Sequence, residues 1–349
     1  MKRKTFCALF LALFFITIAQ TGCGSKEPIT RTSFYFNTPC SITLYDMQEE
    51  EAQSLITELF RQCKEMEALL SKTIPTSDVA RINAAGGEPV EVSSITIQVL
   101  EKAVDYSVLS EGAFDVTVGK LTDLWDFQAE SPVVPSAHQI QEALPTVDYR
   151  GIEISGNRVS LSNPDSAIDL GGIAKGFIAD RLTESLEAKG IERGIINLGG
   201  NIVALGEKEE DTGWEIGIEK PYSDRREIVE VVSLSDQSVV TSGIYERAFQ
   251  VDGRLFHHVL DVKTGYPVQS DLESVTIIGP KGSSADCDAL STIALILGSQ
   301  KGMALIESLE GFEASFVCKN GEILHTSAMN AWPVDSDAAV VDRQRAQSD

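Results

Sequence analysis

A glycine bend with a charged residue on either side is the first feature of this sequence that could bind a ligand. Residues 169–177 read Asp-Leu-Gly-Gly-Ile-Ala-Lys-Gly-Phe, and apolar residues then recur at helical spacing. Glycines let a backbone approach a ligand closely, and the start of a helix presents free N–H groups to anions. With Asp169 and Lys175 beside it, the bend predicts a diphosphate site, although a pair of glycines alone is better explained as an ordinary tight turn.

A second candidate is the pair formed by Asp288 and Thr292, four residues apart in a segment (285–297) that we expect to be helical. That spacing places both side chains on one face of the helix. A carboxylate beside a hydroxyl suits Mg²⁺, which takes oxygen ligands and shares them with phosphate. A lone pair of this kind is more often solvated or marks a helix start, and Asp286 is an alternative capping carboxylate.

His258 and Asp115 are two further candidates. His258 follows a predicted hairpin strand, and its polar, loop-forming neighbours favour a functional site over a buried structural histidine. An imidazole titrates near neutral pH, so His258 could take a proton from a hydroxyl. Asp115 ends the run 113–115, and two roles are equally compatible with it: a site residue, or a carboxylate that accepts hydrogen bonds from the nearby backbone.

The elements that must position these residues are mixed helices and strands without regular alternation, which predicts an α+β fold rather than a doubly wound sheet. Neither G-x-G-x-x-G nor G-x-x-x-x-G-K-[ST] occurs, so neither a Rossmann nor a P-loop site is indicated. The pattern predicts helices over about 55–70 and 94–110, hairpins over 152–161 and 248–260, a loop over 71–87 and a surface excursion over 128–147.

The N-terminus predicts export. Residues 1–22 have the charged start, apolar middle and small residues of a signal peptide, and Gly22-Cys23 resembles a bacterial lipoprotein box. We therefore expect Cys23 to be lipidated and to anchor the protein on the extracytoplasmic face of a membrane in a bacterial cell envelope. The predicted organisation is a signal peptide (1–22), the lipidated cysteine with a tether (23–32), one domain (33–334) and a polar tail (335–349).

The net charge and the cysteine spacing limit the classes of partner and of site that this chain can have. A formal net charge of -23 argues against a nucleic-acid partner, which needs a basic face. The cysteines beyond Cys23 have no C-x-x-C spacing, and a chain of this length needs no disulfide staples. We expect free buried thiols at Cys40, Cys63, Cys287 and Cys318.

Six segments that carry the candidate residues occur in one order, and together they closely resemble the ApbE family, the FAD:protein FMN transferases. With 36–38 and 77–83, the resemblance spans about residues 33–330. The six segments are 112–119, 169–176, 197–200, 241–247, 258–267 and 288–292.

The resemblance implies an α+β fold of two similar halves, with FAD in the cleft between them. It implies that the carbonyl of Gly172 holds Mg²⁺ together with Asp288 and Thr292. It also implies FAD contacts from Phe36, Asn83, Ala113, Phe114, Asp115, Asp169, Lys175, His258 and Val259.

The implied reaction is protein flavinylation: the FMN half of FAD moves onto a Thr or Ser hydroxyl of another protein, and AMP is released. Lys175 and His258 are the expected catalytic residues. Exported proteins, such as subunits of membrane redox complexes, are the expected acceptors. Two alternatives stay open, namely a FAD pyrophosphatase that forms FMN and AMP, and a non-enzymatic flavin-binding lipoprotein.

Overall fold

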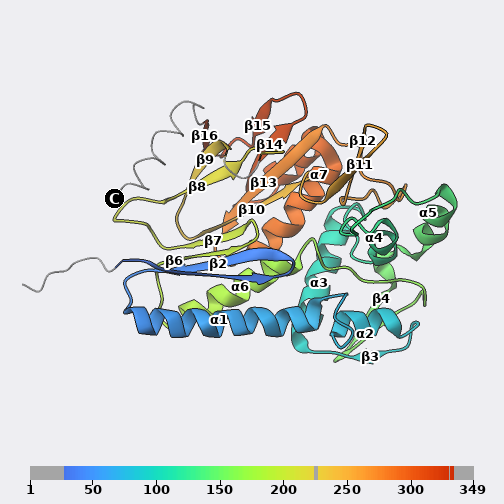
Figure 1. The fold of residues 1–349 in the computed structure, drawn as a ribbon, viewed down its shortest axis with the longest axis horizontal. Coiled ribbons are helices and arrows are strands. Elements are labelled where there is room, and N and C mark those ends of the chain that lie inside the picture. Colours follow the sequence, from blue (N-terminus) through green and yellow to red (C-terminus); the bar gives the residue numbers. More distant parts are fainter. Residues whose placement is uncertain (1–26, 224–226, 330, 334–349) are drawn as a thin grey trace, which may run out of the picture.

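One antiparallel sheet of eight strands runs through the part of the chain that the structure describes, residues 27–223, 227–329 and 331–333 (Figure 1). The structure is a computed structural model. The predicted signal peptide, Cys23 and the polar tail (335–349) lie outside the described residues. In spatial order the strands are β1 (Ile29–Tyr35), β2 (Thr38–Leu44), β6 (Gly194–Leu198), β7 (Asn201–Leu205), β10 (Gln237–Gly243), β13 (Leu272–Pro280), β14 (Glu313–Cys318) and β15 (Ile323–His325).

The sheet is divided into two similar halves. The first half holds the pair β1–β2, the helix α6 (Ala174–Glu187) and the pair β6–β7. The second half repeats this sequence of elements with β10–β13, the helix α7 (Ser284–Glu307) and β14–β15. The halves join where β10 pairs with β7. This topology confirms the predicted α+β class.

The helices α6 and α7 pack against each other on one face of the sheet. Gly176 makes their approach close, because a Cβ there would lie only 2.7 Å from Cα of Ala285. In α7, Gly298 has a φ of 79° and breaks the helix, at the position where the sequence predicts a stop. Among the described helices, α7 alone is long and apolar enough to span a membrane, but it packs against β13 and β10 as the core helix of this domain.

Further helices cover the edges of this core. Two of them, α1 (Glu49–Leu70) and α3 (Ser94–Leu109), are confirmed predictions. The shorter helices are α2 (Asp78–Ala84), α4 (Gly119–Trp125) and α5 (Ala137–Ala143), with two 3₁₀ turns at Leu144–Thr146 and Tyr149–Gly151. Three small sheets complete the described fold: β3 (Val90–Glu91) with β4 (Ile152–Ser155) and β5 (Arg158–Leu161), β8 (Trp214–Glu219) with β9 (Ile228–Leu234) and β16 (Ala331–Pro333), and β11 (Ala248–Val251) with β12 (Arg254–His257).

The structure adds detail at three places where the sequence predicted irregular chain. The predicted loop 71–87 contains α2, and the predicted excursion 128–147 contains α5. Both helices are too short to show a repeating pattern of apolar residues in the sequence. Each follows a serine whose hydroxyl accepts a backbone N–H, Ser77 before α2 and Ser136 before α5. The predicted tether 23–32 is shorter, because β1 already begins at Ile29.

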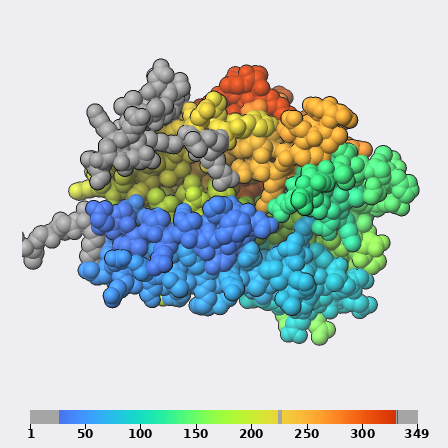
Figure 2. Space-filling view, in the orientation of Figure 1, coloured from blue at the N-terminus to red at the C-terminus, as the bar shows by residue number. Residues whose placement is uncertain are grey.

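A satellite cluster of aromatic residues joins α4 to the β11–β12 hairpin. The Trp125 ring stacks on Phe127 at 5.5 Å between ring centroids and lies 5.5 Å from Phe256. Its Nε1 donates to the backbone oxygen of Gly265 at 2.8 Å. Figure 2 shows the same neighbourhood on the surface, where the green residues around α4 and α5 lie beside the orange hairpin. This packing holds the segment that follows β12, which begins with His258, against α4.

Candidate active site

The glycine bend and the helix α7 meet at Asp288. The Asp288 side chain is buried, and its Oδ2 accepts the backbone N–H of Gly176 at 3.0 Å. Its Oδ1 lies 3.6 Å from Nζ of Lys175. Two segments that are 112 residues apart in the sequence therefore share one carboxylate. The pairing of the bend with the Asp288 helix, on which the predicted diphosphate site depends, is present in the structure.

Thr292, one turn further along α7, faces the bend itself. A Cβ placed on Gly172 would lie 3.5 Å from Oγ1 of Thr292 and 3.0 Å from Cε2 of Phe114. The Ser242 hydroxyl at the end of β10 lies 3.4 Å from the Thr292 hydroxyl and 2.8 Å from that of Ser291. Gly172, Asp288 and Thr292, the three residues expected to hold Mg²⁺, are thus neighbours.

The start of α6 differs from the prediction of free N–H groups. Ile173 and Ala174 both donate to the backbone oxygen of Leu170, at 3.1 and 2.9 Å. Gly176 donates to Asp288, which caps the helix from α7. These three donors are used within the protein, and the Lys175 side chain, which is 22% exposed, adds a positive charge at this helix start.

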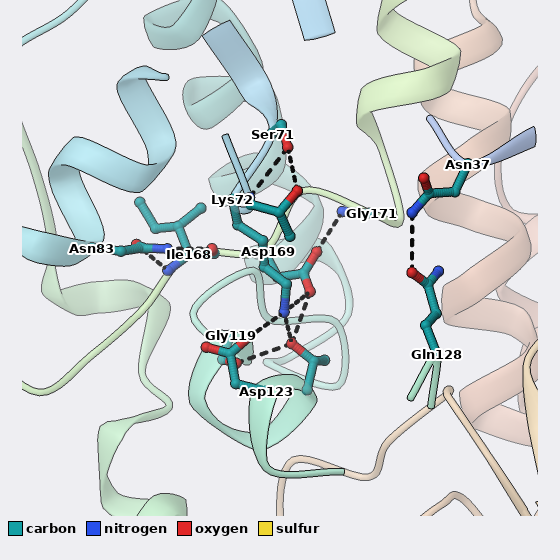
Figure 3. A network of polar contacts seen from close by, with 12 residues as sticks. Asn37, Ser71, Lys72, Asn83, Gly119, Asp123, Gln128, Ile168, Asp169 and Gly171 are labelled. Carbon is teal, nitrogen blue, oxygen red and sulfur yellow. Dashed lines mark hydrogen bonds and ion pairs between the residues drawn. The ribbon is translucent and has the colours of Figure 1, made fainter. Parts of the chain in front are cut away.

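Asp169 sits at the centre of a polar network that Figure 3 shows. Its Oδ2 accepts the Thr122 hydroxyl at 2.8 Å and lies 3.0 Å from Nζ of Lys72. Its Oδ1 accepts the backbone N–H of Gly171 at 2.9 Å. Burial would raise the pKa of this carboxyl, but the Lys72 ammonium and these hydrogen bonds hold the pKa below its ordinary value.

Lys72 is the residue of this site that sequence reasoning missed. It follows α1 by two residues, and besides Asp169 its Nζ reaches Oγ1 of Thr122 and Oδ1 of Asp123, both at 2.7 Å. Burial would lower the pKa of Lys72, but the Asp169 and Asp123 carboxylates raise it. The one signal in the sequence was a basic residue within the predicted loop 71–87, in the short segment between α1 and Ser77.

Asn83 and Asp115 have their polar atoms occupied by the protein. The Asn83 amide donates to the backbone oxygen of Ile168 at 2.9 Å and accepts its N–H at 2.7 Å, as a neighbouring strand would. Asp115 accepts three hydrogen bonds, from the backbone and hydroxyl of Thr117 and the backbone of Tyr149. Of the two roles open for Asp115, the geometry supports the backbone acceptor. Both residues brace the chain that leads into the bend.

The remaining expected FAD contacts are distributed around these segments. The Phe114 ring is buried against Gly172, and Ala113 donates its N–H to the oxygen of Ser110 at 3.0 Å. The buried Val259 accepts the N–H of Val268 at 2.9 Å, which fixes the strand beside His258.

Phe36 lies at the tip of the β1–β2 hairpin, apart from these contacts. Its φ of 54° and the φ of 58° at Asn37 are those of a two-residue hairpin turn. Its backbone N–H donates to Glu67 at 2.7 Å, which ties the tip to α1. Asn37 donates to Gln128 at 3.0 Å across the surface (Figure 3).

His258 has an unsatisfied nitrogen and a neutral ring. Among the described residues, its buried Nδ1 has no hydrogen-bond partner. Burial, with the charges of Arg247, His257 and Lys175, lowers the pKa of His258 to about 3. The ring is therefore neutral at physiological pH and can accept a proton, although the same shift makes it a weaker base than free imidazole.

Comparison with known proteins identifies the family. The family model described as ApbE matches residues 36–316. The chain belongs to the ApbE family. It is 36% identical over 310 residues to a protein of Klebsiella pneumoniae (strain 342) named FAD:protein FMN transferase, covering 87% of this chain and 94% of that one. A protein of the same name from Treponema pallidum (strain Nichols) is 33% identical over 344 residues, covering 93% and 91%.

Solved structures of ApbE proteins have the same fold. The crystal structure of the Thermotoga maritima ApbE protein matches with a TM-score of 0.79 and 31% identity, covering 86% of this chain and 97% of that one. The apo form of the Pseudomonas stutzeri flavinyl transferase ApbE matches with a TM-score of 0.76 and 29% identity, covering 87% and 96%. The family and fold expected from the resemblance are thereby confirmed.

The oxygen donors of this ApbE protein fit Mg²⁺. One buried carboxylate at Asp288, the hydroxyl of Thr292 and the backbone of Gly172 come together, and Mg²⁺ is typically bound by one or two carboxylates with substrate phosphates completing its ligands. The described residues contain no cluster of three His, Cys, Asp or Glu side chains that could hold a metal without a substrate. The donor set therefore suits a cation that binds together with a diphosphate.

The four cysteines within the described residues are neither paired nor exposed. Cys40, Cys63, Cys287 and Cys318 are free and buried, as predicted. Burial raises the pKa of Cys40 to about 11 and that of Cys63 to about 12, which keeps both as thiols.

Proposed function

We propose that this protein is a Mg²⁺-dependent FAD:protein FMN transferase that attaches FMN to a Thr or Ser hydroxyl of an exported acceptor and releases AMP. The observation that carries the proposal is the shared carboxylate of Asp288, which brings Lys175 beside the oxygen donors of α7. A metal cation and a lysine ammonium side by side can together compensate the negative charge of a diphosphate. The names of the relatives, FAD:protein FMN transferase, support the substrate assignment.

Phosphoryl transfer depends mainly on positioning and on compensation of charge. Gly172, Asp288 and Thr292 would hold the Mg²⁺, which when bound neutralises charge on the diphosphate oxygens. Lys175 would contact the same diphosphate and compensate the charge that develops on the departing AMP phosphate. Asp169 would border the FAD site through the bend whose shape it fixes.

His258 is the proposed base. The acceptor oxygen forms a bond to the FMN phosphorus while the bond from that phosphorus to the bridging oxygen breaks, and AMP leaves with that oxygen. The hydroxyl proton passes to His258, whose ring is neutral and whose Nδ1 is unpaired among the described residues. Because a base with a lowered pKa is a weak one, part of the rate must come from the positioning of the acceptor hydroxyl beside His258.

The direct test is the mass of an acceptor. A Thr-containing acceptor peptide incubated with FAD, Mg²⁺ and the protein should gain one FMN, and omission of Mg²⁺ should abolish the gain. An acceptor that stays unmodified while free FMN and AMP accumulate would identify a FAD pyrophosphatase instead. FAD that binds tightly and remains intact in every mixture would identify a flavin-binding lipoprotein.

The role of His258 has its own test, with a matched control. His258→Ala should lower the rate of FMN transfer by about 10²–10⁴-fold, the range for loss of a general base. His138→Ala is the control, because His138 is a histidine on α5 with a side chain that is 79% exposed. Equal rates for wild type and His258→Ala would remove His258 from the mechanism.

We also propose that the enzyme acts outside the cytoplasm, anchored to the membrane through a lipid on Cys23. The support is the signal-peptide pattern of residues 1–22 and the following Gly-Cys pair. Exported subunits of membrane redox complexes would then be its acceptors. Metabolic labelling with a radioactive fatty acid should mark the wild-type protein and not a Cys23→Ser variant; equal labelling would overturn the anchor.

A further inference from the structure

We propose that Lys72 is a positioning residue for the FAD site, acting through Asp169. The inference rests on the proposed FAD-dependent function and extends it to a residue with no assigned role. Lys72 lies outside the glycine bend and outside α7, so it is separate from the expected ligands of the diphosphate and the cation.

The Lys72 ammonium ties together three segments that surround the bend. It comes from the turn after α1, and its Nζ reaches Thr122 and Asp123 on α4, at 2.7 Å each, and Asp169 before the bend, at 3.0 Å. Figure 3 shows Lys72 pointing at Asp169 and Asp123. Its side chain is only 22% exposed, so the three contacts form in a partly dry environment, where charge pairs are stronger than at an open surface.

The contacts continue from Lys72 to the cation site. Lys72 and Thr122 hold Oδ2 of Asp169, so the carboxylate cannot rotate, and Oδ1 is kept on the N–H of Gly171. The next residue is Gly172, whose vacant Cβ position is 3.5 Å from the Thr292 hydroxyl. Lys72 thus affects the shape of the bend indirectly, through the carboxylate of Asp169.

The charge of Lys72 also predicts that its loss weakens FAD binding. Without the ammonium, Asp169 and Asp123 would present uncompensated negative charge beside a site that must bind an anionic diphosphate. FAD would then bind less tightly, because like charges repel and because the bend is less well defined. The groups assigned to the chemical step, Lys175 and His258, would keep their contacts. Loss of Lys72 should therefore raise KM for FAD and leave kcat nearly unchanged.

A purely structural ion pair would behave differently. Asp123, the outer partner of Lys72, has a side chain that is 59% exposed, and pairs of this kind contribute little to stability. If Lys72 served only folding, its removal would lower the melting temperature and leave KM for FAD where it was. The two roles are separated by measuring FAD affinity directly.

The experiment compares Lys72→Met with Lys120→Met. Lys120 is an exposed lysine on α4, so its variant makes the same change in net charge. KM and kcat of FMN transfer are measured together with FAD binding to the metal-free protein by flavin fluorescence, a readout that needs no turnover. Lys72→Met should raise KM and the dissociation constant of FAD roughly tenfold or more, Lys120→Met less than about twofold, and Lys72→Arg should fall between them.

A double variant tests whether the effect passes through Asp169. In an Asp169→Asn background, Lys72→Met should add less than about twofold to KM, since residues that act through one contact are not additive. Full additivity, or a Lys72→Met protein with the FAD affinity of Lys120→Met, would overturn the proposal. Lys72→Gln replaces Lys72→Met if circular dichroism shows that the latter is unfolded. FMN transfer by the wild type is measured first, so a failure of the proposed function is recognised separately.

Discussion

Asp180 and Asp288 cap each other's helices. Asp180 of α6 accepts the backbone N–H groups of Ser284 and Ala285, at 2.8 and 2.9 Å, and so caps the start of α7. Asp288 of α7 accepts the N–H of Gly176 at 3.0 Å and caps the start of α6. Each aspartate lies four residues after a capped residue of its own helix, Gly176 in α6 and Ser284 in α7, so the two helices cap each other reciprocally.

The two aspartates have different surroundings. Both oxygens of Asp180 are occupied by backbone donors, whereas Oδ1 of Asp288 faces Lys175. Four residues further on, the first helix has Glu184 and the second has Thr292, which faces the bend. Only the second of these aspartates is therefore accompanied by a lysine and by a hydroxyl that faces the bend.

Substitution of each aspartate by asparagine should separate the two roles. Asp288→Asn should lower Mg²⁺-dependent FMN transfer by about 10²-fold or more, because it removes the only carboxylate among the three expected Mg²⁺ ligands. Asp180→Asn, the matched control, should keep transfer while it alters stability. The measurement is the rate of FMN transfer by each variant at saturating Mg²⁺. Equal losses in both variants would contradict the assignment of Asp288 as a Mg²⁺ ligand.

The stability of the protein should depend on the ionisation of Asp180. Burial raises the pKa of its carboxyl from 3.8 to about 6 in the folded protein. The folded state therefore binds this proton more tightly than the unfolded chain does, so the contribution of Asp180 to stability decreases as the pH rises from about 4 to about 6. The decrease amounts to about 3 kcal/mol and is complete above that range.

Urea unfolding of the wild type and of Asp180→Asn across this pH range checks the sign. The free energy of unfolding of the wild type minus that of the variant should decrease between pH 4 and pH 6 and then stay constant. Two curves that run parallel through this range would show that Asp180 does not titrate there.

Much of the site could be predicted because its residues lie in short local motifs. The glycines of the bend and the four-residue spacing of Asp288 and Thr292 are visible without a structure. The two motifs meet because α6 packs on α7. The only sign of this packing in the sequence is the small residue Gly176. The resemblance of six segments in order supplied the rest.

The roles of Lys72 and Asn83 could not be predicted, because they depend on contacts between distant segments, and the sequence left two roles open for Asp115. A lysine in a loop is ordinary until Asp169 and Asp123 are seen beside it. Asn83 looks like a ligand-binding amide, yet both of its polar atoms bind the backbone of Ile168, 85 residues away.

The pH profile of FMN transfer should lack the inflection of a free histidine. The pKa of His258 is lowered to about 3 by burial and by its charged neighbours, and kcat/KM reports the pKa values of the free enzyme. The kcat/KM for the acceptor should therefore show no loss from His258 protonation between pH 8 and pH 5. A tenfold fall per pH unit below about 6.5 would contradict a neutral His258.

A methyl group at Gly176 should force the two helices apart. A Cβ there would lie 2.7 Å from Cα of Ala285 and still closer to the backbone of Ser284. Gly176→Ala should cost about 1–3 kcal/mol of stability and should also weaken FMN transfer, since the N–H that binds Asp288 is displaced. Thermal unfolding and transfer rates are measured on the same preparation.

Gly156→Ala is the comparison for that variant. Gly156 turns the β4–β5 hairpin with a φ of 61° and has open space around it, so its variant should cost about 1 kcal/mol through backbone strain alone and leave transfer unchanged. If Gly176→Ala behaves in the same way, close contact between α6 and α7 is not required for the site.

The most direct test of the account is to locate the cation. Crystals grown with FAD and Mn²⁺, a substitute for Mg²⁺ that scatters anomalously, would show its position independently of the protein model. We expect one anomalous peak about 2.1 Å from oxygens of Asp288 and Thr292, with the FAD diphosphate between the cation and Lys175. A peak elsewhere, or a diphosphate bound away from the 169–176 bend, would contradict it.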